Sequence, residues 1–409
     1  MTHDHVKFFL NYGYFPREFN QTIHFNCIDE DFSERSRKDL SKVAAELFLE
    51  SISKLYKSNE RHLVPLSGGF DSRVILSALM RFTEAKNIYA YSYGAKGTLD
   101  YEIGRKLAQK IGVNHLSFDM QSYQFDIEDL LYNSNAIKQQ TVLFHNPPLS
   151  IIDSLFENFH CWSGIIGDVV AGSAFSYNSS KNQSGAILKY LDTKKYAIDA
   201  EPSSNESLKN FISNSILSGN TNLTLDEKLV LTERYENFYK PIICSGNMVF
   251  NKPFVNSKFS DFMFNLPVTL RENCKLYYEF IKFFDPELYA FPVKKMLGLS
   301  MEASQLAFHY HKSKIRIKKK IGMDKIRLDT NYFDFNYKYF NESKFERLVN
   351  DQIYDLNQRG IIDYIDLDSV IEQFAAGKVS VETIKTLVSL EVHLKNGLTL
   401  DSGIDGGLC

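Results

Sequence analysis

Glycine, hydroxyl and acidic residues stand together in LSGGFDS, residues 66–72, between two apolar runs. Its two glycines let the backbone curl tightly and leave no Cβ in the way of a ligand. The helix expected to follow begins near Asp71, and the free N–H groups and dipole at its start favour an anion. The hydroxyls of Ser67 and Ser72 add donors, so the stretch predicts a phosphate-binding loop.

This loop differs from the P-loop of kinases and GTPases, because the chain has no GxxxxGK[ST] pattern. Where that pattern has a lysine, this loop has Asp71, which repels phosphate unless a cation lies between them. Mg²⁺ is held in this way, by carboxylate and phosphate oxygens together. We therefore expect Asp71 to be a magnesium ligand; the alternative is a tight strand-to-helix turn that binds nothing.

Apolar runs alternate with amphipathic segments around the loop. Short strands are expected at 62–66, 87–94, 114–120 and 160–163, with helices at 33–58, 71–82, 100–112 and 126–137. This alternation predicts an α/β fold, a parallel sheet with helices on both faces, whose ligands bind at the carboxyl ends of the strands. After residue 226 the strand signal fades, and a mostly helical portion is expected.

Composition limits the other classes of function. The 409 residues carry a net charge of 47 − 50 = −3, so no overall field attracts nucleic acid or membrane. The five cysteines are far apart and form no CxxC pair, which argues against disulfides or structural zinc. No run of 18 apolar residues occurs. A cytoplasmic protein with no membrane partner, for which nucleic acid is an improbable ligand, is expected.

SGGFDS resembles the PP-loop of the ATP pyrophosphatases, enzymes that cleave ATP between the α and β phosphates. WSGIIGDVVAGS, from Trp162, resembles the second signature of asparagine synthetases, with Asp168 in the place of the other Mg²⁺ ligand and Gly164 and Gly172 matching. The stretch 252–298, KPFVNSKF to KKMLG, resembles their C-terminal run. The resemblance covers roughly residues 60 to 300 and implies an adenine nucleotide alpha-hydrolase-like fold.

The resemblance implies ATP and Mg²⁺ as cofactors and a set of site residues. Asp71 and Asp168 would hold the metal, and Lys294 or Lys295 would be catalytic, with Lys275 as the next candidate and a solvated surface lysine as the alternative for each. The nucleotide would contact Leu66, Ser67, Gly68, Gly69, Asp71, Ser72 and Gly164.

The implied activity is an ATP-dependent ligase that adenylates a carboxylate, releases pyrophosphate and transfers the acyl group to ammonia or an amine. Three residues before Asp168 the synthetases carry Glu, but this chain has Ile165, which cannot act as a general base. Asn256 likewise replaces a common Asp. Two alternatives stay open: another PP-loop ATP pyrophosphatase of the tRNA-modifying type, or a nucleotide-binding relative with altered or lost acyl-transfer chemistry.

Three divisions of the chain are expected. Residues 1–32 resemble the join between the glutaminase and synthetase parts of the family, 33–275 form the ATP-binding domain, and 276–409 form a helical portion packed on it. Without a glutaminase domain, ammonia would come from solvent or a separate partner. The carboxylate would belong to a small molecule, a peptide or a glycan precursor. A basic run at 311–327 suggests a phosphate-rich partner or, more simply, a solvated helix face.

Overall fold

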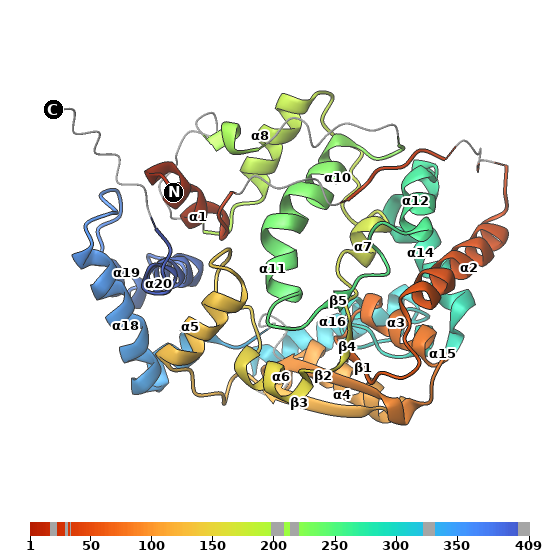
Figure 1. The fold of residues 1–409 in the computed structure, drawn as a ribbon, viewed down its shortest axis with the longest axis horizontal. Helices are drawn as coiled ribbons and strands as arrows, with labels where there is room; N and C mark the ends of the chain where they lie inside the picture. The colour runs from red at the N-terminus through yellow and green to blue at the C-terminus, as the bar shows by residue number, and fades with distance from the viewer. Residues whose placement is uncertain are drawn as a thin grey trace.

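A computed structural model describes most of the chain, namely residues 1–16, 23–28, 32, 34–197, 208–212, 221–321 and 332–399. Its centre is a five-stranded parallel sheet in the order β3-β2-β1-β4-β5 (Figure 1). The strands are β1 His62–Pro65, β2 Ile88–Gly94, β3 Asn114–Asp119, β4 His160–Trp162 and β5 Phe250–Asn251. The expected α/β fold class, with a parallel sheet and a helical remainder, is confirmed.

Helices, together with short 3-10 and π segments, surround the sheet and form the rest of the regular structure. Those that cover the sheet, border the site or build the helical remainder are α1 His3–Tyr12, α2 Arg37–Leu55, α3 Asp71–Leu79, α4 Leu99–Ile111, α5 Ile127–Ala136, α6 Leu149–Phe156, α7 Gly167–Val170, α8 Gln183–Thr193, α10 Leu225–Leu229, η4 Val230–Tyr239, α11 Lys240–Ile243, α12 Lys258–Asn265, α13 Val268–Arg271, α14 Lys275–Phe284, α15 Pro286–Ala290, η6 Lys294–Met296, α16 Gln305–Lys320, α17 Phe335–Asn341, α18 Ser343–Gln358, α19 Val370–Ala375 and α20 Val381–Lys395.

Strand order reverses beside β1. His62 lies level with Ile88 of β2 on one side and with His160 of β4 on the other. From β1 the chain crosses to β2 on one side, and the loop after β4 lies on the other side, so a crevice forms between the two loops. Open α/β sheets bind their ligands in such a crevice. Both segments singled out in the sequence, 66–72 and 163–168, lie in these two loops.

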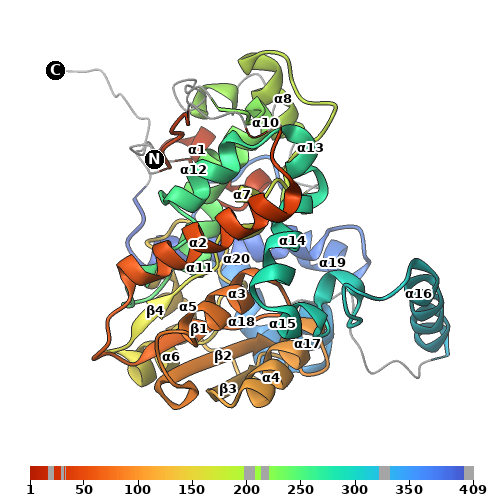
Figure 2. The ribbon, with the colours of Figure 1, turned by 90° about the vertical axis from the view of Figure 1, so that its right-hand side faces the viewer.

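Side chains alternate between two packed faces along each strand. Leu63, Tyr91 and Cys161 form a small apolar cluster with Ile152 and Phe156 of helix α6. Val64, Ala90 and Trp162 face the opposite side, where they share a core with helices α2, α3 and α4. Figures 1 and 2 show α6 on the other side of the strands from α2 and α3. Helices on both faces explain why the central strands β1, β2 and β4 are largely buried, whereas the edge strand β3 is more exposed.

Helix α2 packs along α14, far from it in sequence, and covers the α3 side of the sheet (Figure 2). Phe48 of α2 meets Phe280 of α14 with ring centroids 5.6 Å apart. The start of α2 is fixed by Ser36, whose side chain accepts a hydrogen bond from the Asp39 N–H at 3.1 Å. This packing places the start of α14 beside the phosphate-loop helix.

A second core joins the two ends of the described chain. Phe8, Phe9 and Tyr12 of α1 pack among residues of α20, and the ring centroids of Phe9 and His393 are 5.7 Å apart. Figure 1 accordingly shows α1 next to α20. The division of the chain at residues 33 and 276 stays a prediction. Residues 17–22 and 29–31 of the expected N-terminal division, and 322–327 of the basic run, lie outside the described residues.

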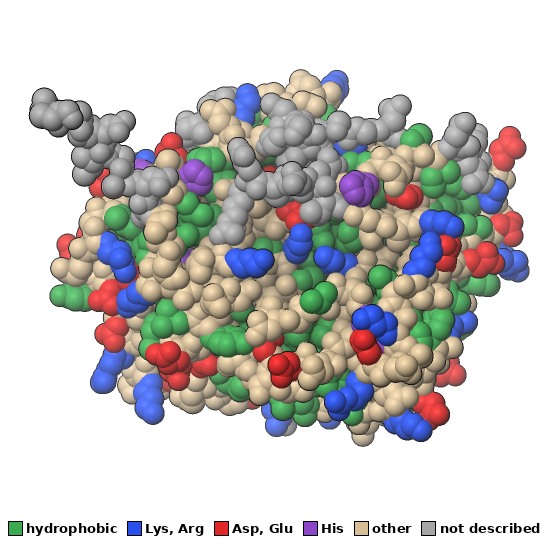
Figure 3. Space-filling view, viewed as in Figure 1, with side chains coloured by type: hydrophobic (Ala, Val, Ile, Leu, Met, Phe, Trp, Pro, Cys, Tyr) green, Lys and Arg blue, Asp and Glu red, His purple; other side chains and the backbone are tan. Residues whose placement is uncertain are grey.

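The molecular surface is mixed in charge. On the face shown in Figure 3, Lys and Arg side chains are interspersed with Asp and Glu. Helix α16, which carries most of the basic run, is set apart from the rest of the chain in Figure 2. Within the part of the chain that the structure describes, no helix has both the length and the apolar composition required to cross a membrane.

Candidate functional site

The loop from Ser67 to Ser72 joins β1 to α3 and is closed by its own side chains. The backbone N–H of Ser67 donates to the Ser72 hydroxyl at 3.3 Å, and the N–H of Gly69 donates to the Ser67 hydroxyl at 3.2 Å. These hydrogen bonds close a tight bend at the start of a nine-residue helix, whose first N–H groups have no partner within the helix. Such an arrangement of amides suits an anion.

The loop after β4 packs directly against Asp71, and glycine makes this contact possible. A Cβ built on Gly164 would lie 2.8 Å from the Asp71 Cβ, and one built on Gly167 would lie 2.7 Å from the Asp71 Cγ. Between them Ile166 adopts a left-handed conformation with φ of 60°. A β-branched residue there stores backbone strain of about 1–2 kcal/mol. The close packing of Gly164 and Gly167 on Asp71, together with the Asp168 N–H hydrogen bond, offsets this strain at the start of α7.

This contact brings the two predicted metal ligands together. The backbone N–H of Asp168 donates to Oδ2 of Asp71 at 3.2 Å, and the Tyr277 hydroxyl donates to Oδ1 at 2.5 Å. Burial, followed by the charge of Asp168, raises the pKa of Asp71 to about 8. Both carboxylates line the same cavity, Asp71 half-buried and Asp168 exposed.

A divalent cation fits this pair of carboxylates. Burial and the neighbouring Asp168 disfavour the ionised form of Asp71. A positive charge between the two carboxylates would stabilise both as anions. Among the described residues, no cluster of three or more His, Cys, Asp or Glu side chains forms a metal cage. Mg²⁺ needs no such cage, because it takes one or two carboxylates and completes its shell with water and phosphate oxygens.

Lys294 reaches the loop from the helical half of the chain. Its backbone N–H donates to the Gly68 carbonyl at 3.0 Å, and its ammonium donates to Oδ2 of Asp100 at 2.5 Å. Oδ1 of Asp100 in turn accepts the Gly68 N–H at 3.0 Å. Lys294, Gly68 and Asp100 therefore form one charge-assisted network at the loop.

A buried arginine fixes the segment that carries this lysine. Arg73 of α3 is fully buried and donates to the carbonyls of Leu288 (2.8 Å), Phe291 (3.2 Å) and Pro292 (2.8 Å). These carbonyls directly precede Val293 and Lys294 in the chain. The helix that starts at the phosphate loop thereby positions the lysine that faces it.

The predicted residues converge on one cavity of about 910 Å³. Its wall contains Leu66, Ser67, Gly69, Asp71, Ser72, Gly164, Asp168, Lys294 and Lys295. Gly68 belongs to the same loop and contributes through its hydrogen bonds. Lys295 is more exposed and donates to the Tyr278 hydroxyl at 2.9 Å. Lys275, the next candidate, is outside this wall and pairs with Glu272. The roles assigned to these residues stay predictions.

Other side chains of the cavity were not singled out from the sequence. Asp100 was not among the predicted site residues; Glu102, two positions further along α4, pairs with Arg105 at 3.0 Å. Tyr277 carries no local sequence signal, since it comes from α14, about 200 positions after Asp71. Ile165, which the sequence did single out, is buried in the cavity wall.

Two histidines, His115 and His145, have hydroxyl partners in the fold. His115 of β3 lies 3.0 Å from the Ser92 hydroxyl, and burial lowers its pKa to about 4. His145 lies 2.8 Å from the Tyr196 hydroxyl, and burial lowers its pKa to about 3. Neither lines the cavity. Both are neutral at physiological pH and pack as structural residues.

The parallel sheet, the loop after β1 and the crevice beside it give the chain a fold like that of the adenine nucleotide alpha-hydrolases. Over residues 61–159 the chain matches the family model described as "Queuosine biosynthesis protein QueC". The matched stretch contains β1 to α6, including the phosphate loop and Asp100, but ends before β4. No curated protein matches the chain significantly. The match supports ATP use and does not indicate asparagine synthetase.

Proposed function

We propose that the chain is a PP-loop ATP pyrophosphatase that adenylates a carboxylate and releases pyrophosphate. The observation that carries this proposal is the convergence, in one crevice beside β1, of the loop Ser67–Ser72 with the carboxylates of Asp71 and Asp168. The similarity of residues 61–159 to the QueC model supports it independently. The rest of the wall, apolar at Ile165 and cationic at Lys294, suits an organic acid and a nucleotide together.

In the proposed reaction an oxygen of the substrate carboxylate attacks the α phosphorus of ATP. The bond between that phosphorus and the oxygen bridging to the β phosphorus breaks, and pyrophosphate leaves with its electron pair. The N–H groups of the loop and the Lys294 ammonium would hold the leaving group. Mg²⁺, held by Asp71 and Asp168, would supply charge neutralisation for the phosphates.

Asp100 makes this arrangement dependent on the ligand. Its carboxylate accepts hydrogen bonds from the Gly68 N–H and the Lys294 ammonium, which are the donors that a phosphate oxygen would use. Phosphate binding would therefore require Asp100 to yield at least one of these hydrogen bonds. Replacing the Asp100 carboxylate by a phosphate oxygen as the acceptor costs little net free energy, because each charge-assisted hydrogen bond that breaks is replaced by another of the same kind.

The second step, acyl transfer to nitrogen, is the asparagine-synthetase-like part of the proposal. An amine or ammonia, supplied by solvent or a separate partner, would attack the acyl carbon, form the amide and release AMP. The order of SGGFDS, WSGIIGD and the lysine segment along the chain supports this candidate. Ile165 cannot accept the proton of the attacking nitrogen. The QueC match accordingly favours a different PP-loop pyrophosphatase, such as one of the tRNA-modifying type.

Pyrophosphate release from Mg-ATP tests the proposal and separates these candidates. We would compare the parent, Asp71→Ala and the control Asp351→Ala, an exposed acid of α18, with carboxylic acids, amines and tRNA as additions. Acid-dependent release that Asp71→Ala abolishes supports adenylation of a carboxylate. Dependence on tRNA supports the tRNA-modifying type. ATP binding without release under any condition leaves only a nucleotide-binding protein and overturns the proposal.

A further inference from the structure

The cavity extends beyond the phosphate loop to a wall built by residues that follow 61–159, the stretch matched by the QueC model. This wall comes from η4 and from the ends of α8 and α11, and its side chains include Lys194, Val230, Tyr239 and Ile243. In Figure 1 the helical run through α10 and α11 extends from the region of α8 toward the sheet. Residues 230–239 are wound as a π-helix, an uncommon form that occurs often at functional sites.

Lys194 brings to this wall a basic side chain that forms no ion pair with any acid of the described residues. Neither Lys194 nor the neighbouring Arg234 forms an ion pair within that part of the chain. The Arg234 guanidinium donates to the Lys194 carbonyl at 3.3 Å and lies over the ring of Phe238. The Arg234 guanidinium therefore lies beside the main chain of Lys194, both residues are half-buried, and Lys194 is on the cavity wall.

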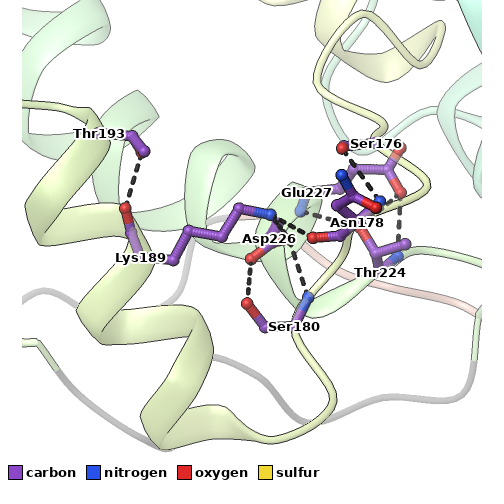
Figure 4. Close-up of polar contacts among 8 residues, drawn as sticks. All are labelled: Ser176, Asn178, Ser180, Lys189, Thr193, Thr224, Asp226 and Glu227. Atoms are coloured by element: carbon purple, nitrogen blue, oxygen red, sulfur yellow. Dashed lines mark hydrogen bonds and ion pairs between the residues drawn. The ribbon is translucent and has the colours of Figure 1, made fainter.

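Asp226, the acid whose charge acts on Lys194, already accepts hydrogen bonds from other donors. Asp226 accepts the N–H of Ser180 at 3.1 Å, the Ser180 hydroxyl at 2.8 Å and the Lys189 ammonium at 2.8 Å. Figure 4 shows Lys189 reaching Asp226 across the gap between α8 and α10. Burial, and after it the charge of Arg234, lowers the pKa of Lys194, and the charge of Asp226 offsets this only in part. An ammonium in this position is stabilised by an external anion.

The rest of the chamber has flat aromatic sides. Tyr93 of β2 stacks on Tyr332 with ring centroids 5.8 Å apart and planes at 21°, and both rings line the cavity together with Tyr91 and Tyr239. Walls of this kind accept a planar or apolar body, since aromatic faces stack on rings at low entropic cost. The chamber thus combines flat contact surfaces with a basic side chain that forms no ion pair with the described residues.

We propose that the substrate activated at the phosphate loop is a planar acid with a second anionic group, carboxylate or phosphate, that binds Lys194. This inference rests on the proposed function and adds the chemical class of the acid to it. Lys194 would be a specificity-determining residue, because an unpaired cation on the wall discriminates against substrates that leave it uncompensated. The triphosphate would have its own donors in the loop and at Lys294, which belong to other segments of the chain than Lys194.

Binding of matched acids tests the inference. Titration calorimetry in Mg²⁺ and a non-hydrolysable ATP analogue would compare benzoate with terephthalate and 4-phosphonobenzoate. We expect both dianions to bind the parent at least about tenfold more tightly than benzoate, a difference of about 1.4 kcal/mol. Lys194→Met should abolish that preference and leave benzoate unchanged. Whichever dianion binds more tightly identifies the second group as carboxylate or phosphate.

A neighbouring lysine provides the control. Lys195 is outside the cavity wall, so Lys195→Met should keep the full preference for the dianions. No preference in the parent, an unchanged preference in Lys194→Met, or weaker binding of the ATP analogue by that variant would each overturn the inference. Failure of the parent to bind the analogue at all would instead reject the proposed function, so the two failures are distinguishable.

Discussion

The carboxylate of Asp100 joins Lys294 to the phosphate loop, accepting the ammonium at 2.5 Å and the Gly68 N–H at 3.0 Å. Lys294 comes from the helical half of the chain and Asp100 from the start of α4. The pair shows that the lysine segment, far away in sequence, completes the loop. It also places a negative charge where a phosphate is expected to bind.

Asp100→Asn should therefore strengthen the binding of pyrophosphate in the absence of Mg²⁺. The substitution removes a like charge from the loop while retaining an amide of the same shape. Two unit charges about 4 Å apart interact by at most about 4 kcal/mol near a protein surface, so a gain of about tenfold is a conservative expectation. Calorimetric titration measures it. Glu102→Gln, on the same helix but paired with Arg105, is the control, and unchanged or weaker binding in Asp100→Asn would contradict the prediction.

Gly167→Ala should disable the site through Asp71. The added Cβ would lie 2.7 Å from the Asp71 Cγ and 2.8 Å from its Oδ1, so the carboxylate must move. We expect loss of most Mg²⁺-dependent ATP binding together with destabilisation of about 1–3 kcal/mol, as for an overpacked core site. Denaturant unfolding and calorimetry measure the two effects. Retention of full Mg²⁺-dependent ATP binding would show that Asp71 need not be held in this position.

Gly69→Ala should separate binding from stability. A Cβ at Gly69 meets only the Ser67 Oγ, at an ordinary 3.5 Å, and the backbone there has no positive φ. The free energy of unfolding should change by less than about 1 kcal/mol. ATP binding should nevertheless fall, because the methyl group would occupy the concave side of the loop. Equal ATP affinity in the parent and Gly69→Ala would disprove close approach of phosphate to this residue.

The sequence predicted the β1 loop and Asp71 better than it predicted the residues that later segments contribute to the site. The β1 loop and Asp71 follow one another in a short motif, and their elements were predicted with nearly correct bounds. Strand β5 was missed because Phe250–Asn251 is only two residues long and lies in a helical region. Tyr277 and Lys194 escaped notice for a different reason: their proximity to the loop depends on packing between distant segments, and nothing local to their sequence indicates it.

The buried pair of Arg271 and Glu227 should be critical to stability near the site. Both side chains are fully buried, and one guanidinium nitrogen contacts both carboxylate oxygens, at 2.7 and 2.8 Å. A Cβ built on Gly172 would lie only 2.5 Å from the Arg271 carbonyl oxygen, so the two segments pack closely here. Arg271→Met should cost about 3–5 kcal/mol, because it leaves Glu227 charged and buried.

Denaturant unfolding measures this loss of stability, and two further variants serve as an exposed-pair control and as a test of the cause. Lys54→Met breaks the exposed pair with Glu50 and should cost less than about 1 kcal/mol. The double variant Arg271→Met with Glu227→Leu removes both charges and should recover part of the loss. A single variant as stable as the parent, or a double variant less stable than the single one, would contradict the account of Glu227 as a stranded charge.

Glu233 of η4 should make the protein less stable as pH rises. Burial raises its pKa from 4.5 to about 8, an effect that the hydrogen bond from Asn237 only partly offsets. Below pH 4.5 the group is protonated in both the folded and the unfolded chain and has no effect. Between pH 4.5 and 8 the folded chain keeps the proton that the unfolded chain loses, so this group lowers the free energy of unfolding by up to about 1.4 kcal/mol per pH unit. Above pH 8 the loss is complete.

Glu233→Gln tests this directly, since glutamine keeps the acceptor for Asn237 but cannot ionise. Its free energy of unfolding should depend less on pH than that of the parent between pH 5 and 8, and the variant should be the more stable of the two at pH 8. Glu346→Gln, an exposed glutamate of α18, should keep the slope of the parent. Identical slopes for parent and Glu233→Gln would mean that Glu233 ionises as readily in the folded chain as in water, and that the π-helix beside the cavity is more hydrated than its packing indicates.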